Sequence, residues 1–249
     1  MFLIELPPPT RYDWHFAIGR IPVRVHPWFW LMTILLGASL RDPVYILIWV
    51  IVVFISILAH ELGHALVMQW YGRPASIVLH LLGGTTVAEP GLVSLGRTLT
   101  PPRPIQEILI PFAGPLAGFL LAGLVLLGAR LAGGQIRFLP AFAGIPWPYV
   151  ILPAHSPLPA TTIDMVLWVN LFWGLINLMP VYPLDGGVIA HHILLQRDPQ
   201  QGMRRFLGLS FVTAVVVALA GLLLLHSTYL CVFFGLLAFQ SYRLWSTSW

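Results

Sequence analysis

Two histidines and a glutamate stand close together in an apolar stretch of the chain. His60 and His64 are four residues apart, and Glu61 follows the first histidine directly, within the sequence Leu58-Ala-His-Glu-Leu-Gly-His-Ala65. On a helix, residues i and i+4 share one face, so both imidazoles can bind one metal ion while Glu61 projects toward a water molecule beside it. The spacing therefore predicts a metal-dependent hydrolytic site on a helix.

The sequence around His60, Glu61 and His64 helps to decide whether these residues form a functional site or have one of two simpler explanations. The residues from about Val44 to Trp70 form a long apolar run. The pattern could be an accident of helix sequence, or the histidines could be core residues whose neighbours satisfy them. A charged side chain at the centre of a membrane helix costs roughly 2.5–3.5 kcal/mol on insertion scales and needs a partner or a water-filled cavity. This cost favours a functional site.

The composition indicates a membrane protein. Of the 249 residues, 58% are hydrophobic and 9% are charged, whereas an ordinary soluble domain has about 25% charged residues. All thirteen basic residues are arginines. The absence of lysine gives no support for nucleic-acid binding, and the arginines are better explained as residues that mark the membrane topology. The single cysteine, Cys231, excludes a disulfide within the chain and a thiolate cluster. Any metal must therefore use nitrogen and oxygen ligands.

The hydropathy pattern predicts an all-α polytopic membrane protein with about six transmembrane helices and a small membrane-associated β-hairpin or loop between the second and third. We expect a single domain over 1–249, with an interfacial segment at 1–26, a catalytic core at 27–195 and two C-terminal transmembrane helices within 196–249. The six spans are expected at about 28–40, 44–70, 105–131, 163–179, 206–225 and 229–245.

The segments between the spans are expected to differ in structure. Residues 76–89 carry β-branched side chains on both sides of Gly83 and Gly84, which predicts a strand-loop or hairpin. Residues 21–25 alternate as a short strand does. Residues 132–162 are rich in proline, glycine and aromatic residues, and we expect an external loop there, with a short re-entrant segment as an open alternative.

The arginines orient the chain. With a cytoplasmic N-terminus, all arginines except Arg41, Arg130 and Arg137 fall on the inner side, as the positive-inside rule favours. Both termini are then cytoplasmic, in a plasma membrane of bacterial type. The second and fourth spans run in the same direction, so this topology brings Asp185, which follows the fourth span, to the depth of His60 and His64.

Asp185 is the best candidate for a third metal ligand. Apart from Glu61, the other acidic residues lie in loops or at segment ends. Pro180 and Pro183 interrupt regular helix just before Asp185, and irregular backbone at membrane depth must be buried in protein or face a cavity. Two imidazoles and one carboxylate leave one position of a tetrahedral zinc ion open, as in catalytic sites. We expect one Zn²⁺ per chain.

The expected reaction is hydrolysis of a peptide bond. Zinc lowers the pKa of a water molecule toward about 7, and Glu61 can take the proton and pass it to the leaving amine. The amide of Asn177 either stabilises the developing oxyanion or makes an interhelical hydrogen bond, and the sequence leaves both interpretations open. His191 and His192 are assigned to interface or packing roles, and Glu107 to a helix terminus.

Two motifs far apart carry a resemblance to a known family. The run His60-Glu-Leu-Gly-His64, followed by Asn177-Leu-Met-Pro-Val-Tyr-Pro-Leu-Asp185-Gly186, resembles the site-2 protease family of intramembrane zinc metalloproteases. Similarity extends to Val23-Arg-Val-His-Pro27, Leu82-Gly-Gly84 and Ala113-Gly-Pro-Leu116. One departure is Val188, where family members frequently carry arginine.

The resemblance implies that His60, His64 and Asp185 bind zinc, that Glu61 is the general base and that Asn177 assists near the scissile carbonyl. It also implies that the substrate is a transmembrane segment of another protein, often a membrane-tethered regulator in regulated intramembrane proteolysis. A further regulatory membrane partner stays open.

A helical substrate must be unwound before water can reach its peptide bonds. The region 79–87 offers an edge to which an extended segment could add as a strand, and Gly83 and Gly84 would allow close approach of the two backbones. Rival interpretations are a metal-binding membrane transporter and a non-catalytic scaffold of the same fold. A serine or aspartyl protease is disfavoured, because the chain has no Gly-x-Ser-x-Gly motif and only one deep aspartate.

Overall fold

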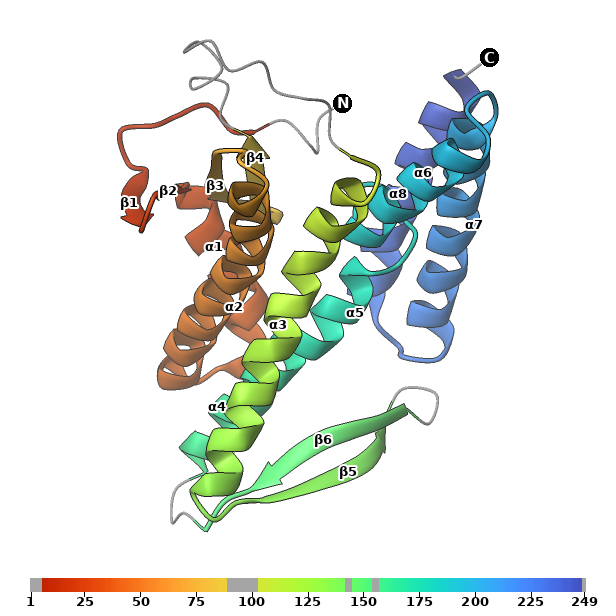
Figure 1. The fold of residues 1–249 in the computed structure, drawn as a ribbon. Helices are drawn as coiled ribbons and strands as arrows, with labels where there is room; N and C mark the ends of the chain where they lie inside the picture. Colours follow the sequence, from red (N-terminus) through yellow and green to blue (C-terminus); the bar gives the residue numbers. More distant parts are fainter. Residues whose placement is uncertain (1–5, 89–102, 142–144, 154–156, 248–249) are drawn as a thin grey trace. The chain divides into compact units, whose positions relative to one another are not determined.

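Helices dominate the computed structural model, which describes residues 6–88, 103–141, 145–153 and 157–247 (Figure 1). The mostly helical architecture expected from the sequence is confirmed. The chain divides into two compact units. The first comprises Met1–Pro101, Ala113–Ala141 and Pro146–Gly174, and the second comprises Pro102–Phe112, Phe142–Ile145 and Leu175–Trp249.

The first helices of the chain start at prolines. These helices are α1 (Pro27–Gly37) and α2 (Pro43–Trp70), and the 3-10 turn η1 (Ala38–Leu40) lies between them. The fixed φ of proline suits the first position of a helix, and the residue before each proline is the cap. The Nδ1 atom of His26 accepts from the Trp28 N–H at 3.3 Å, and Asp42 accepts from the Val44 N–H at 2.8 Å. These caps fix where both apolar helices begin.

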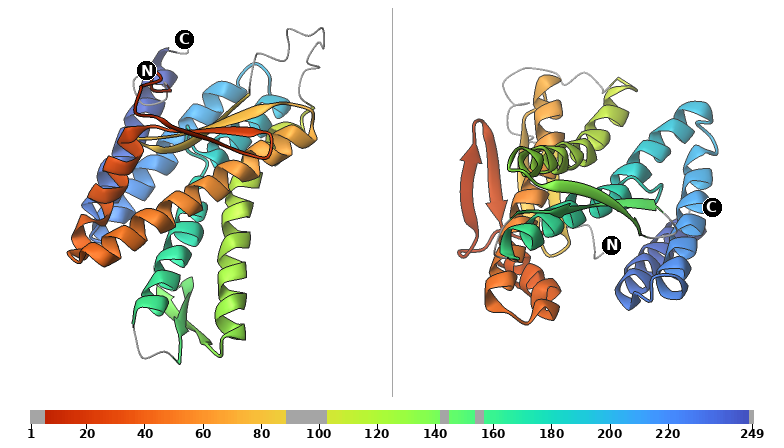
Figure 2. Two further views of the ribbon diagram at one scale, coloured as in Figure 1. Left: turned by 90° about the vertical axis from the view of Figure 1, so that its left-hand side faces the viewer. Right: turned by 90° about the horizontal axis from the view of Figure 1, so that it is seen from below.

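Four strands of the first unit form one sheet in the order β1-β2-β3-β4 (Figure 2). The strands are β1 (Trp14–Ile18), β2 (Ile21–Val25), β3 (Ala75–His80) and β4 (Gly83–Ala88). The outer pairs are antiparallel, whereas β2 and β3 are parallel, with Val23 opposite Ile77. Val23, Val25, Ile77 and Leu79 are almost fully buried, and α2 packs against β3 and β4. The sheet therefore extends beyond the segment at 76–89 and takes in the N-terminal strands.

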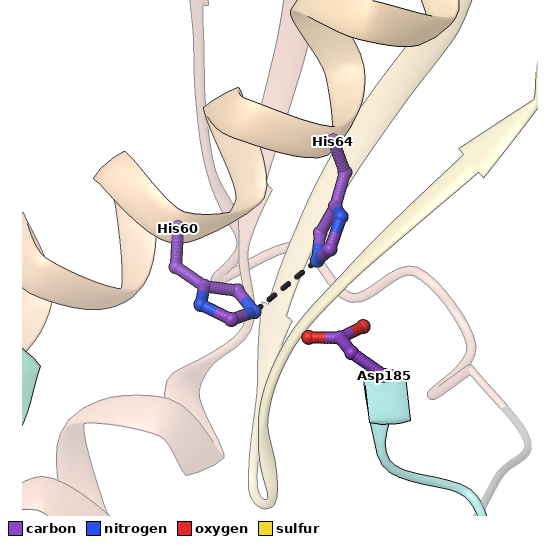
Figure 3. A group of neighbouring side chains, drawn as sticks. All are labelled: His60, His64 and Asp185. Carbon is purple, nitrogen blue, oxygen red and sulfur yellow. Dashed lines mark hydrogen bonds between the residues drawn. The ribbon is translucent and has the colours of Figure 1, made fainter. Parts of the chain in front are cut away.

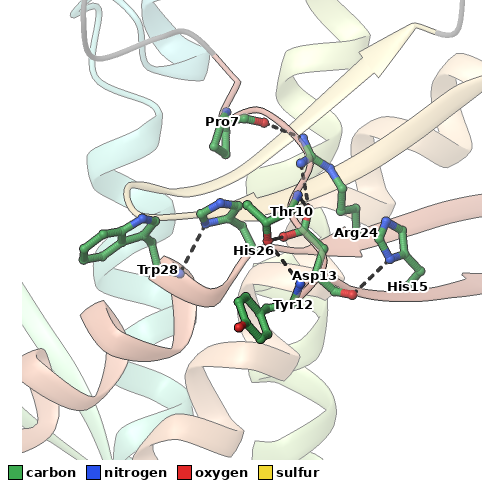
Figure 4. A network of polar contacts seen from close by, with 8 residues as sticks. All are labelled: Pro7, Thr10, Tyr12, Asp13, His15, Arg24, His26 and Trp28. Atoms are coloured by element: carbon green, nitrogen blue, oxygen red, sulfur yellow. Dashed lines mark hydrogen bonds and ion pairs between the residues drawn. The ribbon is translucent and has the colours of Figure 1, made fainter.

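An ion pair ties the N-terminal segment to β2 (Figure 4). The Arg24 Nη1 atom lies 3.0 Å from the Asp13 Oδ2 atom, and the backbone N–H and hydroxyl of Thr10 both donate to the Asp13 carboxylate. Burial raises the pKa of Asp13, but the hydrogen bonds from Thr10 and Arg24 and the charge of Arg24 outweigh it, and the pKa falls from 3.8 to about 2.

A second, smaller sheet lies between α3 (Gln106–Leu131) and α4 (Leu158–Leu167) in sequence. It consists of β5 (Gln135–Ala141) and β6 (Ile145–Ile151), so the expectation of a plain loop over 132–162 was wrong. Pro140, Pro146 and Pro148 hid these strands in the sequence, and a two-stranded ribbon tolerates proline because both its strands are edges. A core of Ala122, Ala129, Val150 and Leu167 joins α3, β6 and α4.

Four helical stretches are long and apolar enough to cross a membrane, counted over the residues that the structure describes. They are Pro43–Trp70, Gln106–Leu131, Leu158–Asn177 and Gly202–Leu223, with the shorter apolar helix Pro27–Leu40 beside them. The expected count of six spans is not confirmed. Large apolar side chains such as Leu47 and Ile51 on α2 and Leu124 on α3 are exposed, as lipid-facing positions are.

The third of these stretches is not a uniform helix. After α4 the chain passes through a π-helical turn, η4 (Trp168–Phe172), and ends in α5 (Trp173–Asn177). Asn170, only 3% exposed, donates from its side-chain amide to the Ser56 hydroxyl of α2 and to the Val166 carbonyl, both at 2.8 Å. This hydrogen bond holds η4 against α2.

The second unit is built on α6 (Asp185–Arg197), α7 (Gly202–Leu223) and α8 (Thr228–Thr247). The helices α7 and α8 pack along their length, and the buried hydroxyls of Ser210 and Ser241 form a hydrogen bond of 2.8 Å between them. The Tyr182 N–H donates to Ser210 at 2.8 Å. This chain of contacts anchors the loop that leads into α6.

Candidate metal centre

The imidazoles of His60 and His64 face each other one turn apart on α2 (Figure 3). Their Nε2 atoms are 3.2 Å apart, and the two rings are nearly perpendicular. Two nitrogens bound to one zinc ion at about 2.0–2.1 Å in tetrahedral geometry lie roughly 3.3 Å apart. The pair therefore fits a shared metal ion in the orientation that it already has.

A glycine of α3 leaves room beside these nitrogens. A Cβ atom on Gly114 would come within 2.7 Å of the His60 Nε2 atom and would overlap the His64 ring. Gly63 of α2 allows the close packing that brings Gly114 there, since a Cβ atom on Gly63 would overlap the Ala113 carbonyl and lie 2.9 Å from the Ala117 Cβ. The sequence indicated close helix contact at Ala113–Gly118, but it did not show that this contact opens space at the imidazoles.

Glu61 is 5% exposed and is fixed by β4. The Thr86 hydroxyl lies 2.7 Å from the Glu61 Oε2 atom and 3.1 Å from the Glu61 carbonyl oxygen. Gly84, two residues earlier on β4, lies against the same carboxylate, because a Cβ atom there would be 2.6 Å from the Glu61 Oε1 atom. Sequence reasoning named Gly84 but missed Thr86, although residues i and i+2 of a strand share a face.

The two glycines expected to bind substrate differ in their surroundings. Gly83 has φ +123°, in a region that favours glycine, and a Cβ atom there would meet nothing within 4 Å. Gly84 is opposite Leu79 in the β3–β4 pair and faces Glu61. The backbone conformation accounts for the glycine at 83, and the carboxylate accounts for the glycine at 84.

Asp185 is the first residue of α6. Gly186 and Gly187 follow it, and a Cβ atom on either would overlap the carbonyl of Leu178 or Val181 in the preceding loop. This loop can fold back tightly only because both residues are glycines. One ligand atom each of His60, His64 and Asp185 lie within 4.8 Å of one another, so these three residues could hold a metal ion (Figure 3). Two imidazole nitrogens and a carboxylate oxygen suit zinc.

The other polar residues singled out from the sequence have separate positions. Asn177 is the last residue of α5, and its role stays a prediction. Glu107 and His192 form an ion pair within the second unit, and the His191 ring lies 5.2 Å from the Phe206 ring. The packing role expected for His191 agrees with its ring contact, whereas His192 makes an ion pair that the sequence did not predict.

Comparison with known proteins shows the family and the fold. The model of peptidase family M50 matches residues 48–223. A zinc metalloprotease of Methanocaldococcus jannaschii is 28% identical over 73% of this chain and 45% of its own length. A candidate zinc metalloprotease of Synechocystis is 32% identical over 72% of this chain and 43% of its own length. The chain thus spans under half the length of these relatives.

A solved structure shares the fold across nearly the whole chain. The site-2 protease from Methanocaldococcus jannaschii superposes with a TM-score of 0.56, at 24% identity, and covers 93% of this chain and 94% of that one. The resemblance found in the two sequence motifs is confirmed by these matches.

Proposed function

The chain belongs to peptidase family M50, and on this premise we propose that it is an intramembrane zinc endopeptidase. It hydrolyses a peptide bond within or near a transmembrane segment of a membrane-tethered regulatory protein, as a step of regulated intramembrane proteolysis. The observation that carries this proposal is the geometry on α2: two imidazoles fitted to one ion, with a buried glutamate beside them that β4 holds in place.

His60, His64 and Asp185 are the proposed zinc ligands, and Gly114 keeps the space beside the two imidazoles open. When bound, zinc supplies Lewis-acid activation of a water molecule and of the scissile carbonyl. The imidazoles contribute neutral ligands on a rigid helix, and Asp185 contributes the negative charge. The bilayer around α2 excludes bulk water, which strengthens each of these electrostatic contacts.

Glu61 is the proposed general base. Its carboxylate takes a proton from the attacking water and returns it to the amine that leaves, so the proton stays at one side chain through both steps. Burial and the Thr86 hydrogen bond restrict the carboxylate to one orientation. Asn177 is proposed to donate its amide hydrogen to the developing oxyanion.

The substrate is proposed to bind β4 as an added strand. Among the described strands of the first sheet, β4 is at one end of the order, so its second edge can pair with an extended peptide. Gly84 on this strand lies beside Glu61, so a peptide on the same edge would present its backbone near the general base. The unwinding that hydrolysis requires would thereby be coupled to binding.

The proposed topology places both termini in the cytoplasm of a cell with a bacterial-type plasma membrane. The basis is the excess of arginines on the inner side of the predicted spans. A regulatory membrane partner is compatible with this arrangement.

The test is Glu61→Gln, with Glu107→Gln as the matched control at a second helical glutamate. Each purified variant is reconstituted with single-span fusion proteins, and cleavage and bound zinc are measured together. Glu61→Gln should keep its zinc and lose cleavage by 10²- to 10⁴-fold, and it should retain a membrane-spanning partner on crosslinking, whereas Glu107→Gln should cleave normally. Zinc retention with undiminished cleavage by Glu61→Gln would contradict the role of Glu61. Zinc flux into vesicles without cleavage would favour a transporter.

A further inference from the structure

The Thr86 hydroxyl distinguishes the two oxygens of the Glu61 carboxylate. Its hydroxyl has a single proton and two acceptors on Glu61, the Oε2 atom at 2.7 Å and the main-chain carbonyl oxygen at 3.1 Å. Hydrogen bonds to a carboxylate are short and strong, so the hydroxyl donates chiefly to Oε2. The carbonyl offers a second acceptor on the same residue.

The other carboxylate oxygen of Glu61 has a different neighbour. Oε1 faces Gly84, where a Cβ atom would come within 2.6 Å of it. Because glycine has no side chain, the surface of β4 beside Oε1 carries backbone only. One face of β4 thus contacts the two oxygens differently: the Thr86 hydroxyl donates to Oε2, whereas only the Gly84 backbone lies against Oε1.

We infer that this face of β4 assigns the two oxygens their roles, with Thr86 as the positioning residue of Glu61. The inference rests on the proposed function. Thr86 holds Oε2, so Oε1 is the oxygen that takes the proton from water and later gives it to the leaving amine. Gly84 brings no side chain against Oε1.

A consequence of this arrangement concerns substrate binding. Thr86 and Gly84 belong to the strand proposed to pair with the substrate, so the backbone that receives the peptide also holds the general base. A peptide that orders β4 would then also order Glu61. Loss of the Thr86 hydroxyl should accordingly affect turnover rather than binding, because the backbone edge of β4 is unchanged.

Thr86→Val removes the hydroxyl and keeps the shape of the side chain, and Thr86→Ser restores the donor. In the zinc-loaded enzyme, Thr86→Val should lower kcat by about 10- to 100-fold, as loss of an orienting partner does in metal sites, with KM within about twofold and zinc content unchanged. Thr86→Ser should recover most of kcat. Equal kcat in Thr86→Val and wild type, or no recovery in Thr86→Ser, would overturn the inference.

A second readout is independent of cleavage. Infrared spectra are recorded in nanodiscs on protein labelled with ¹³C-glutamate. Subtracting the spectrum of Glu61→Gln from that of the wild type isolates the carboxylate band of Glu61. This band should shift in Thr86→Val and stay in place in Thr86→Ser. It should also stay in place in Thr85→Val, a matched control on the opposite face of β4, where the Thr85 hydroxyl is 2.8 Å from the His80 Nε2 atom.

The two readouts separate the inference from the proposed function. An unshifted band in Thr86→Val overturns the role of Thr86 whether or not the protein is a protease. A shifted band in Thr86→Val, together with a wild type that cleaves none of the fusion proteins, supports the contact and contradicts the proposed function.

Discussion

Two sheets of the first unit pack against apolar helices, and within the residues that the structure describes only the β3–β4 pair contacts the candidate site. The β3–β4 pair lies on α2 and contacts Glu61 through Thr86 and Gly84. The β5–β6 pair instead meets α3 and α4 through a core of apolar side chains around Val150. The face of β4 on α2 gives Glu61 a hydrogen-bond donor, whereas Val150 of β6 contributes to an apolar core.

The prolines of the β3–β4 and β5–β6 pairs differ in the same way. The ribbon β5–β6 carries Pro140, Pro146 and Pro148, whereas β3 and β4 have none. A strand that receives a peptide by main-chain pairing needs the N–H that proline lacks. A strand that only covers an apolar core does not need a free backbone N–H at its edge.

The largest effect in this comparison is expected from proline on β4. Thr85, Val87 and Ala88 of β4 are replaced by proline one at a time, and alternate residues of a strand direct their N–H to opposite edges. Variants whose proline lies at the free edge should fold, bind zinc and lose cleavage about five- to tenfold, since each main-chain hydrogen bond contributes about 1–1.5 kcal/mol. Cleavage of the single-span fusion proteins and zinc content are measured together. Unchanged cleavage in every folded variant would contradict the proposal that the substrate binds β4 as an added strand.

An intermediate effect is expected on β6, and it concerns stability alone. Val150 is almost fully buried in the core between α3 and α4, so Val150→Ala should lower the free energy of unfolding by about 2 kcal/mol. Cleavage per zinc-loaded molecule should stay at the wild-type rate. Phe138→Ala, at an exposed position of β5, is the control for thermal unfolding and should change little. A drop in kcat for Val150→Ala would contradict the expectation that β6 contributes to stability and not to cleavage.

The smallest effect is expected from acid at the N-terminal end of the first sheet. Because the folded-state pKa of Asp13 is lowered to about 2 from 3.8, its contribution is full above the unfolded value and is lost as the pH falls from about 3.8 to 2. The rate of pepsin digestion ahead of β1 should therefore rise relative to Asp13→Asn across this window, and the two proteins should converge at its acid end. A constant ratio of the two rates would show that the carboxylate contributes nothing there.

Local periodicity explains which parts of the site could be predicted. The distance between His60 and His64 follows from the helical repeat, so the pattern at residues 58–65 was sufficient to pair them. Asp185 was reached by elimination among the acidic residues, because only one other was expected deep in the membrane. The π-turn at η4 and the strands β5 and β6 have no such repeat, and sequence reasoning missed them.

The sequence by itself determined the metal-binding pattern, the apolar helices that carry it and the family, because each depends on the order of residues within one element or motif. Only the tertiary structure decided that Thr86 and Gly84 hold Glu61, that Gly114 leaves room at the imidazoles and that β2 pairs with β3. These contacts join residues 23 or more positions apart, and no local pattern names the partner of a strand or the neighbour of a glycine. Packing selects them, since a buried carboxylate must find a donor and two helices can approach closely only where side chains are absent.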